Sequence, residues 1–501
     1  MRPVRAVIPP DGAAGAQERI LVALLQVPFP RVFRSLMRSL ALLAAVTVMG
    51  LSACVNLPTV NEQQLLQEAS GSQPIRVYGT RGPLSARQAR KVLARVNAKA
   101  IDADALDRQL AIEQIVSESP LYTGNSVRVL QDGAQTFPAM FAAMEAARRF
   151  LYLEYYTLQD VQSGGHKLSD VLAAKARAGV HIRVIYDAVG SLGTPATFFT
   201  DLQEAGVVFV QYNPINPLKG PFSLNQRDHR KILIADDKVA VVGGVNLATT
   251  YESAPPIAHA LGGNKQPPAK AAHPVWHDVD LEIRGPVVPQ LSRLFRQHWR
   301  EQKGPPLPME APAKQVPQGR DIVRVIGSSP TRLATRYYVS VLSAMHSAQS
   351  TIWMTAAYFV PTRQELHALR AAAHRGVDVR ILLPSHSDVG ATLAVQRSYY
   401  PELLAAGIKV YERSDGIVHS KSMVVDGIWS LVGSSNFDQR SILFNDEVDV
   451  VVLGKTPAEE LRKTMLADIG HGRRIDWQTV RQEGTLQRMK GWFWRFWQRL
   501  L

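Results

Sequence analysis

The clearest pattern of apolar and polar positions occurs twice, once in each half of the chain. Residues 150–160 (FLYLEYYTLQD) and 351–361 (TIWMTAAYFVP) are rich in aromatic and β-branched residues and alternate in the way that predicts a buried strand. An Ala/Arg-rich stretch with helical periodicity follows each of them and ends at Gly179 or Gly376, and glycine is common at a helix C-terminus. A second strand is predicted directly after each glycine.

The order of helix, glycine and strand recurs further along each half. Residues 202–212 (LQEAGVVFVQY) match residues 403–413 (LLAAGIKVYER), with Gly206 and Gly407 at corresponding places. Strands that alternate with helices are typical of a largely parallel sheet covered by helices. The pattern therefore predicts an α/β fold of two homologous domains, each with a mostly parallel mixed sheet.

Two predicted hairpins carry the most unusual polar residues of the chain. Residues 228–244 (DHRKILIADDKVAVVGG) and 418–434 (VHSKSMVVDGIWSLVGS) each place two apolar strands on either side of a tight turn. In both, a histidine is followed at the same offsets by a lysine, an aspartate, a glycine and an asparagine. These residues are His229, Lys231, Asp236, Gly243 and Asn246 in the first half, and His419, Lys421, Asp426, Gly433 and Asn436 in the second. Because side chains alternate along a strand, the histidine and lysine of each motif are predicted on one face.

A duplicated hairpin with a purely structural role is the alternative explanation. A single His-x-Lys-x4-Asp match occurs by chance in on the order of a few per hundred chains of this size. Two matches with identical glycine and asparagine offsets, at corresponding points of a duplicated unit, are far rarer. A structural hairpin also has no need of a histidine and a lysine on one strand face, so the functional explanation is favoured.

Composition limits the partners and the chemistry. The 501 residues are enough for two domains with additional segments, and the formal net charge of +14 favours an anionic partner. Nucleic acid, a phosphate-bearing substrate and an anionic membrane surface all satisfy that condition. Cys54 is the only cysteine, which excludes an internal disulfide and a cysteine-based metal site. No other convincing set of metal ligands is present, so we expect neither a metal nor another cofactor.

The single cysteine ends a stretch that has the organisation of a secretory signal. Met37-Arg38 precedes the apolar run LALLAAVTVMG, and the small residues of LSAC follow it. The LSAC ending resembles the lipobox of bacterial lipoproteins, in which the cysteine is lipidated and becomes the N-terminus. An uncleaved anchor is the alternative, although a run of about fifteen apolar residues is short for a bilayer. We expect an exported protein anchored at Cys54, on the periplasmic side of the inner or outer membrane, with Met37 as an alternative translation start.

Shifts in composition divide the chain into segments. They are a signal and lipobox segment at 1–54, an N-terminal helical or linker region at 55–125, a first domain at 126–303, a Pro-rich linker at 304–319, a second domain at 320–480 and an aromatic-basic tail at 481–501. An insertion rich in Pro, Gly and Ala, at about residues 252–274, occurs in the first half only.

The paired motifs resemble the HKD motifs of the phospholipase D superfamily, over roughly residues 125–480. More narrowly, YFVPTRQELHALRAAAHRGVDVRILLP, GSSNFDQRSILFNDEVDVVV and DIGHGRRIDWQ are similar to segments of bacterial cardiolipin synthases. The resemblance implies two phospholipase D-like domains, related by a pseudo-two-fold axis, around one shared active site. It also implies a phosphatidyltransferase that moves a phosphatidyl group from phosphatidylglycerol to a second phospholipid hydroxyl through a phosphohistidine, with release of glycerol.

Phosphodiester cleavage without a metal requires cations, a nucleophile and an acid for the leaving oxygen. Lys231 and Lys421 would supply the charge, and Asn246 and Asn436 would supply amide donors to the phosphate. In-line displacement requires the nucleophile and the acid on opposite sides of phosphorus, so each motif would contribute half of one site. By the commoner family arrangement, His229 is the nucleophile and His419 the acid and later the base.

Four carboxylates complete the expected site. The family pattern has a histidine-orienting carboxylate after each motif, and this role is carried over to Asp278 in WHDVDLEIR and to Glu447 in FNDEVDVVV. Asp236 and Asp426 belong to the catalytic motif of the family. Their predicted position at the hairpin turns leads us to expect that they brace the fold.

The C-terminal sequence MKGWFWRFWQRLL holds three of the eight tryptophans of the chain. As a helix, it would present aromatic and basic residues suited to a lipid interface, or it would pack on the second domain. We therefore expect anionic phospholipids and a membrane surface as partners, with phosphatidylglycerol or phosphatidylethanolamine as the acceptor, and no nucleic acid. The remaining alternatives are a phospholipase D that uses water, a nuclease of the same superfamily and an inactive lipoprotein.

Overall fold

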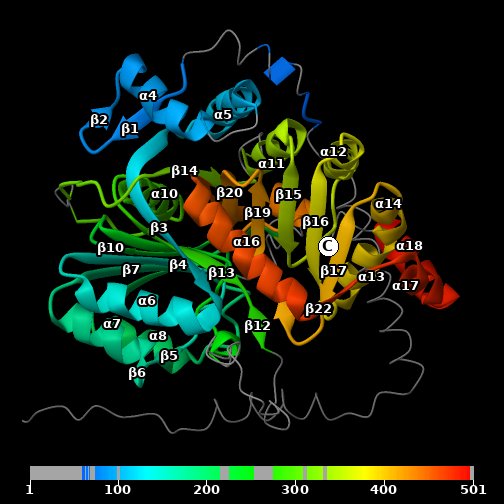
Figure 1. The fold of residues 1–501 in the computed structure, drawn as a ribbon. Helices are drawn as coiled ribbons and strands as arrows, with labels where there is room; N and C mark the ends of the chain where they lie inside the picture. Colours follow the sequence, from blue (N-terminus) through cyan, green and yellow to red (C-terminus); the bar gives the residue numbers. More distant parts are fainter. Residues whose placement is uncertain are drawn as a thin grey trace, which may run out of the picture. The chain divides into compact units, whose positions relative to one another are not determined.

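Each motif lies in its own set of sheet strands, and the first seven strands of the second set follow the order of the seven strands of the first. The first set is coloured cyan to green and the second yellow to orange (Figure 1). In spatial order, the first sheet contains β3 (Leu121–Gln131), β13 (Val279–Arg284), β11 (Val239–Gly243), β10 (Lys231–Ala235), β4 (Phe150–Tyr155), β7 (His181–Asp187) and β8 (Val208–Tyr212). The second contains β14 (Asp321–Ser328), β21 (Asn445–Leu453), β20 (Trp429–Gly433), β19 (Lys421–Val425), β15 (Thr351–Ala356), β16 (Asp378–Pro384), β17 (Lys409–Arg413) and β22 (Gly472–Arg474). The repeat seen in the sequence is therefore a repeat of sheet topology.

This computed structural model describes residues 59–61, 64, 65, 67, 74–98, 102–214, 225–252, 275–308, 313–330 and 336–496. Cys54 and nearly all of the predicted insertion lie outside these residues. Among the described helices, none combines the length and the apolar character that would be needed to cross a membrane.

The predicted α/β class with mixed sheets is confirmed, but the parallel share of each sheet is smaller than predicted. Among the strands of these two sets, the parallel pairings are β4–β7 and β7–β8 in the first and β15–β16 and β16–β17 in the second. The predicted hairpins, β10–β11 and β19–β20, are integral to the sheets and pair antiparallel with β4 and β15. The prediction was wrong on this point because the β-α pattern covers only the parallel strands, whereas each hairpin brings in further antiparallel neighbours.

Helices cover the sheets and end where the glycines predict. In the first half they are α6 (Asp132–Ala146), α7 (Leu168–Arg177), α8 (Ala196–Glu204) and α10 (Val288–Glu301). In the second half they are α11 (Arg336–Ser347), α12 (Arg363–His374), α13 (Gly390–Ser398), α14 (Tyr400–Ala405), α15 (Gln439–Leu443) and α16 (Lys455–Gly470). The four glycines that follow α7, α8, α12 and α14 all have positive φ, between 83° and 103°, which glycine adopts without steric cost.

The two halves share a sheet and a core. β3 and β14 pair antiparallel, with Tyr122 opposite Val323, so the sheets are continuous across the pseudo-symmetric halves. One hydrophobic cluster combines Ile232 and Val242 of the first hairpin with Val424 and Val432 of the second. Burial of this cluster requires both halves, and the described residues after Asn56 belong to one compact unit.

The region before the first sheet packs on the second half. It contains β1 (Val77–Gly79), β2 (Gly82–Pro83), α4 (Ala86–Asn97) and α5 (Ala103–Ser117). Glu113 of α5 forms a fully buried ion pair with Arg324 of β14 at 2.8 Å and accepts a hydrogen bond from Trp429 of β20 at 2.9 Å. These contacts fix α5 against the sheet that carries the second motif.

Short elements complete the described chain. They are β5 (Gln162–Ser163), β6 (His166–Lys167), β9 (Arg227–Asp228), the 3₁₀ turn η1 (Thr249–Tyr251), β12 (Trp276–His277), β18 (Ile417–Val418), α17 (Trp477–Gln482) and α18 (Thr485–Phe496). Of these, β9, β12 and β18 position the candidate site.

Candidate active site

Two short parallel strand pairings, one for each motif histidine, place that histidine against the opposite half of the molecule. β9 pairs with the start of β21, and the His229 amide donates to the Asp446 carbonyl at 2.9 Å. In the same way β12 pairs with β18, and the His419 amide donates to the His277 carbonyl at 2.7 Å. The residues that follow Asp446 and His277 are Glu447 and Asp278, so the backbone sets each histidine beside the carboxylate of the opposite half.

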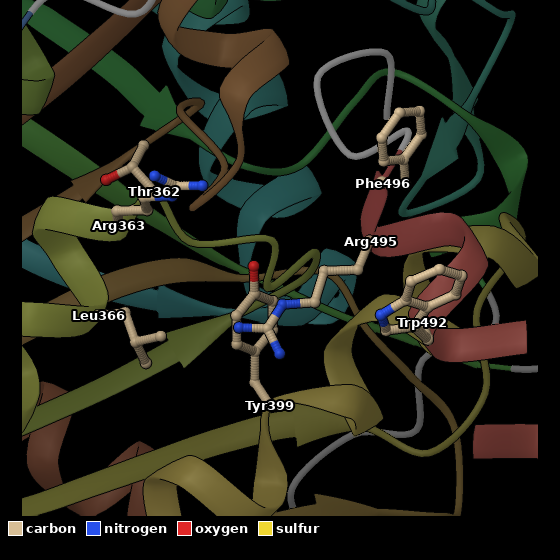
Figure 2. A pocket seen from close by; sticks show the side chains of 7 residues that line it. All are labelled: Thr362, Arg363, Leu366, Tyr399, Trp492, Arg495 and Phe496. Atoms are coloured by element: carbon tan, nitrogen blue, oxygen red, sulfur yellow. The ribbon is translucent and has the colours of Figure 1, made fainter. Parts of the chain in front are cut away.

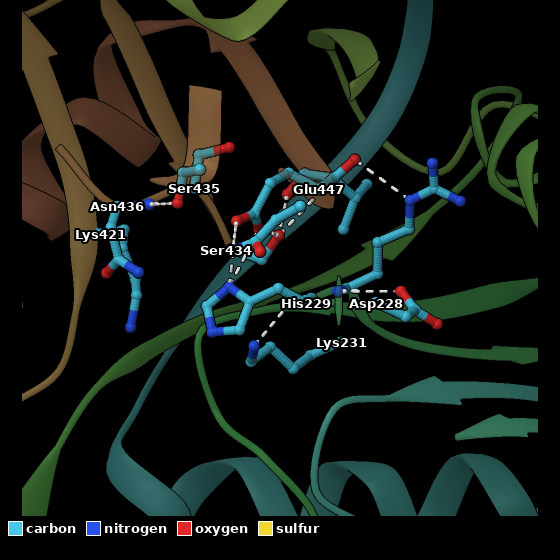
Figure 3. A network of polar contacts seen from close by, with 12 residues as sticks. Asp228, His229, Lys231, Lys421, Ser434, Ser435, Asn436 and Glu447 are labelled. Atoms are coloured by element: carbon cyan, nitrogen blue, oxygen red, sulfur yellow. Dashed lines mark hydrogen bonds and ion pairs between the residues drawn. The ribbon is translucent and has the colours of Figure 1, made fainter. Parts of the chain in front are cut away.

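The side chains complete these crossed pairs. His229 Nδ1 lies 3.0 Å from Glu447 Oε2, and His419 Nδ1 lies 2.7 Å from Asp278 Oδ2. Both carboxylates are almost completely buried, and Figure 3 shows the His229 ring held between Glu447 and Lys231. A carboxylate at Nδ1 fixes the tautomer with Nδ1–H as donor, so each Nε2 is the unprotonated nitrogen. The sequence placed Asp278 and Glu447 after the motifs, but the exchange between halves was not predicted.

The two pairs differ in the groups that hold the carboxylate. Glu447 accepts hydrogen bonds from the Ser434 hydroxyl at 2.5 Å and from Asn445 Nδ2 at 3.1 Å. The first half has Gly244 where the second has Ser434, and a Cβ at Gly244 would lie 2.1 Å from Asp278 Oδ1. Glycine thus makes room for the shorter carboxylate at this position.

Tyr251 supplies the missing hydroxyl on the Asp278 side. Its hydroxyl donates to Asp278 Oδ2 at 3.3 Å and lies 2.9 Å from His419 Nδ1. Sequence reasoning missed Tyr251. The sequence difference between Gly244 and Ser434 could have indicated it. Because Gly244 has no hydroxyl, Asp278 needs a hydroxyl partner from elsewhere in the chain.

The motif lysines begin strands β10 and β19 and lie next to their histidines. Lys231 Nζ donates to the His229 carbonyl at 2.6 Å, and Lys421 Nζ lies 3.0 Å from His419 Nε2. Burial, together with the neighbouring Lys421, lowers the pKa of Lys231 to about 7. Burial lowers the pKa of Lys421 to about 8, against the opposing effect of Asp278 and Glu447. An anionic phosphate between the two lysines would hold both in the ammonium form.

Both imidazoles are neutral near pH 7. Burial and the two lysines lower the pKa of His229 to about 4, although Glu447 acts in the opposite direction. Burial, Lys421 and Lys231 also lower the pKa of His419 well below its usual range. A neutral imidazole has the lone pair that a nucleophile needs, whereas the opposite histidine gains a proton only when a negative phosphodiester enters.

The two carboxylates are held in different electrostatic states. Burial raises the pKa of Asp278 to about 6, with Lys421 and the backbone amide of Val279 acting in the opposite direction. Burial also acts to raise the pKa of Glu447, but His229 and Lys231 outweigh it and the net shift is downward. Glu447 is therefore the more persistently ionised of the two.

Both histidines and both motif asparagines open onto one cavity of about 450 Å³. Tyr156, Tyr358 and Trp276 form aromatic walls, and the cations Arg227 and Arg440 lie on its lining. Asn436 Oδ1 is buried and has no hydrogen-bond partner among the described residues. The structure thus brings together His229, His419, Lys231, Lys421, Asn246, Asn436, Asp278 and Glu447, as one centre from two halves.

Asp236 and Asp426 lie at the opposite ends of β10 and β19, away from this cavity. Asp236 accepts hydrogen bonds from the backbone amides of Arg148, Arg149 and Phe150 at 2.8–2.9 Å. Asp426 accepts the corresponding bonds from the amides of residues 349–351 at 2.7–2.9 Å. Both have positive φ, 56° and 52°, as residues of tight hairpin turns. Each carboxylate ties its hairpin to the start of the adjacent strand, which is a bracing contact.

Replacing Asp236 with asparagine should lower the free energy of unfolding by roughly 2–4 kcal/mol, because buried amides lose a charged acceptor while the turn conformation is retained. Urea unfolding followed by tryptophan fluorescence measures this. The folded variant should keep most of its activity. Unchanged stability with lost activity would instead place Asp236 in the chemistry.

A buried polar network lies beneath the site and joins the halves. Arg230, between the motif His and Lys, donates to Glu154 Oε1 at 3.1 Å and to the carbonyls of Glu447 and Ser328, both at 3.2 Å. His298 Nδ1 lies 2.7 Å from the same Glu154 oxygen. Ligand atoms of Glu154, Asp228 and His298 all lie within 4.8 Å of one another. Since Arg230 and His298 already donate to the Glu154 oxygen, these residues make a better ion-pair network than a metal site.

The chain is similar in sequence to known cardiolipin synthases. Residues 140–253 and 341–469 match the family model described as cardiolipin synthase, PLD-like domain. A cardiolipin synthase of Geobacillus sp. (strain WCH70) is 35% identical over 384 residues, which are 74% of this chain and 72% of that protein. A cardiolipin synthase of Alkalihalophilus pseudofirmus is 33% identical over 383 residues, 75% of this chain and 72% of that protein. The chain belongs to the PLD-like cardiolipin synthase family.

A solved structure supports the fold of this cardiolipin synthase family member. The crystal structure of a phosphatidylserine synthase from Haemophilus influenzae superposes with a TM-score of 0.55 at 12% identity, covering 78% of this chain and 99% of that one. The two matched segments include the histidine, lysine and asparagine of both motifs as well as Glu447, whereas Asp278 lies outside them. The resemblance read from the paired motifs is thereby confirmed.

Proposed function

We propose that the chain transfers a phosphatidyl group from phosphatidylglycerol to the hydroxyl of a second phospholipid, with cardiolipin and glycerol as the products when the acceptor is phosphatidylglycerol. The observation that carries the proposal is the pair of crossed His–carboxylate contacts, 3.0 and 2.7 Å long, at one cavity with two lysines behind it. This arrangement supplies two imidazoles and two cations to one phosphodiester. Asn246 and Asn436 would donate to its non-bridging oxygens.

In the first step, His229 Nε2 attacks phosphorus. The P–N bond forms as the bond to the glycerol oxygen breaks, and His419 donates its proton to that oxygen. Lys231 and Lys421 compensate the charge on the non-bridging oxygens, and this compensation is strong because both are buried. The products of this step are a phosphatidyl-histidine and free glycerol.

In the second step, His419 removes the proton from the acceptor hydroxyl. The acceptor oxygen attacks phosphorus on the side that glycerol left, the new P–O bond forms, and the P–N bond breaks. His229 returns to its neutral form and His419 regains its proton, so the cycle closes without another co-reactant.

The assignment of His229 as nucleophile is supported by its carboxylate. Glu447 has a lowered pKa and two additional donors, Ser434 and Asn445, that keep it ionised and fixed. A permanently ionised partner stabilises the positive charge that His229 acquires when it is phosphorylated. Asp278, with a pKa of about 6, is less persistently ionised, so it stabilises the charged form of its histidine less and suits a histidine that must give its proton away.

We further propose export and a lipid anchor at Cys54, with anionic phospholipid as both the substrate and the surface. The support is the LSAC sequence after the apolar run and the net charge of +14. The aromatic walls of the cavity would contact the lipid backbone.

A product assay in mixed micelles tests the function. Labelled phosphatidylglycerol is incubated with the wild type, alone and with phosphatidylethanolamine, and the lipids are separated by chromatography. We expect cardiolipin from the first mixture and its absence with His229→Ala or His419→Ala. Phosphatidic acid as the main product would instead show that water is the acceptor, and turnover of DNA but not of lipid would contradict the proposal.

A further inference from the structure

Helix α18 presents an apolar stripe to solvent. Met489, Trp492, Phe493 and Phe496 have the i, i+3, i+4, i+7 spacing of one helix face, and they are 65, 75, 52 and 76% exposed. Large aromatic side chains that cluster on one exposed face mark an interaction surface. We call these four side chains the docking stripe.

The opposite face of α18 packs against the second half of the molecule. The docking stripe is therefore not the face by which the helix attaches to its own domain. A Cβ at Gly491 would lie 2.9 Å from the Ala394 carbonyl, which shows that the backbones of α18 and α13 are in close contact. Arg495 forms an ion pair with Glu402 at 2.7 Å and lies 4.1 Å from the Tyr399 ring centre. Trp494 is half-buried against the core of the second half. The fold therefore fixes α18 with the docking stripe outward.

Helix α13 connects the docking stripe to the catalytic cavity. Val389 and Thr392, at its start, line that cavity, whereas Ala394 and Ser398 face α18. The nine residues of α13 span about 13 Å, so the residues that line the cavity and those that contact α18 lie on one short helix. Val389 is itself 39% exposed and places an apolar side chain at the cavity.

Cations lie beside the docking stripe. A groove of about 250 Å³ runs between α18 and the start of α12, where Arg363 and Arg495 lie with Trp492 and Phe496 (Figure 2). Arg363 is exposed and has no hydrogen bond or ion pair with any residue that the structure describes. Lys490, on α18 itself, is also exposed. Positive charge next to exposed Trp and Phe is complementary to an anionic lipid surface rather than to an apolar protein face.

The chain also arrives at this groove from its N-terminal side. Gln364, next to Arg363, accepts from the Val60 amide at 3.1 Å and donates to the Val60 carbonyl at 2.9 Å. Val60 is six residues after Cys54 in the sequence.

We propose that the docking stripe and Arg363 form the surface by which the protein lies on an anionic phospholipid bilayer, with the cavity opening beside it. The proposal rests on the proposed function, because it identifies how the lipid substrate reaches the cavity. The four apolar side chains enter the bilayer interface, and Arg363 and Lys490 meet the phosphate groups of the lipid.

The test uses the fact that Cys54 is the only cysteine. Full-length chain with Cys54→Ser and Trp492→Cys is labelled with an environment-sensitive fluorophore. Chain with Cys54→Ser and Leu466→Cys, at a 37% exposed position on α16, is the matched control. On vesicles containing phosphatidylglycerol, we expect a blue shift and at least a threefold increase in emission at position 492 and little change at 466. No change at 492, an equal change at both positions, or a vesicle-independent change that grows with protein concentration would overturn the proposal, and the last would indicate a second copy as the partner.

A kinetic test separates the failure of docking from the failure of the proposed function. Trp492→Ser with Phe496→Ser should lower turnover of phosphatidylglycerol in vesicles at least tenfold, and Leu466→Ser should not. Turnover of dispersed short-chain phosphatidylglycerol should be unchanged in both. Equal turnover of vesicles by the double variant would overturn the docking surface. Absence of all lipid turnover in the wild type would overturn the function, while the fluorescence result would still decide whether α18 meets the bilayer.

Discussion

Replacement of His229 or of His419 by asparagine is expected to lower phosphatidyl transfer from phosphatidylglycerol by at least about 10³-fold. The loss of His229 removes the atom that bonds to phosphorus. The loss of His419 leaves glycerol to depart as an unprotonated alkoxide and leaves the acceptor hydroxyl without a base. Initial rates in mixed micelles measure both effects. Asparagine retains a side chain of similar size in the cavity, so the comparison isolates the imidazole.

A diester whose leaving group needs no proton separates the two roles. With a p-nitrophenyl ester of phosphatidic acid, the His419→Asn variant should release a burst of p-nitrophenolate and then stop as the phosphatidyl-enzyme. The His229→Asn variant should show no burst. The reverse result, with a burst only in the His229 variant, would exchange the roles of the two histidines.

Replacement of Asp278 by asparagine is expected to lower kcat/KM by about 10² to 10⁴ at pH 7, because His419 loses the acceptor that fixes its tautomer. The pH profile of the wild type carries the signature of this residue. Below its pKa of about 6, Asp278 is protonated and no longer accepts the Nδ1–H of His419, so kcat/KM should fall on the acid side from about pH 6. Above pH 7 the ammonium form of Lys231 is lost, so kcat/KM should fall there as well.

The Asp278→Asn variant should lose the acid limb near pH 6, because asparagine does not titrate. The matched variant Glu447→Gln should be similarly slow but should keep that limb, since Asp278 remains. If the limb near pH 6 persists in Asp278→Asn, or disappears in Glu447→Gln, the crossed assignment of the carboxylates is wrong.

The sequence predicted the parts of this protein that local patterns encode. Alternation in residues 150–155 and 351–356, the glycines after the helices and the tight turns at Asp236 and Asp426 each act over a few residues, and the structure has the corresponding strands, caps and hairpins. Identical offsets also predicted that the two motifs work together. Strand geometry fixes the spacing of the histidine and lysine in each motif. That spacing can therefore be recognised in the sequence alone.

Long-range pairing was beyond such patterns. The exchange of Asp278 and Glu447 between the halves depends on β9 pairing with β21 and on β12 pairing with β18, and each of these pairings joins only two residues to two. Two-residue strands have no periodicity to detect. Tyr251 and Arg230 were missed for the same reason, because their partners are distant in sequence.

The tail illustrates a different limit. The sequence left open whether the aromatic tail packs on the second domain or faces lipid. In the structure α18 packs through Gly491 and Arg495 and leaves Trp492 and Phe496 exposed, so the first alternative holds for one face of the helix only. Which residues face inward depends on the shape of α13, which the sequence of the tail does not contain.

The central claim is that one centre, built from both halves, transfers a phosphatidyl group through His229. Rapid quenching of the wild type with labelled phosphatidylglycerol, followed by digestion and mass spectrometry, tests it most directly. The account predicts a phosphatidyl group on His229 within the first turnover, which is then lost to an added phospholipid acceptor as cardiolipin. An adduct on His419, or product formation without any adduct on the chain, would contradict it.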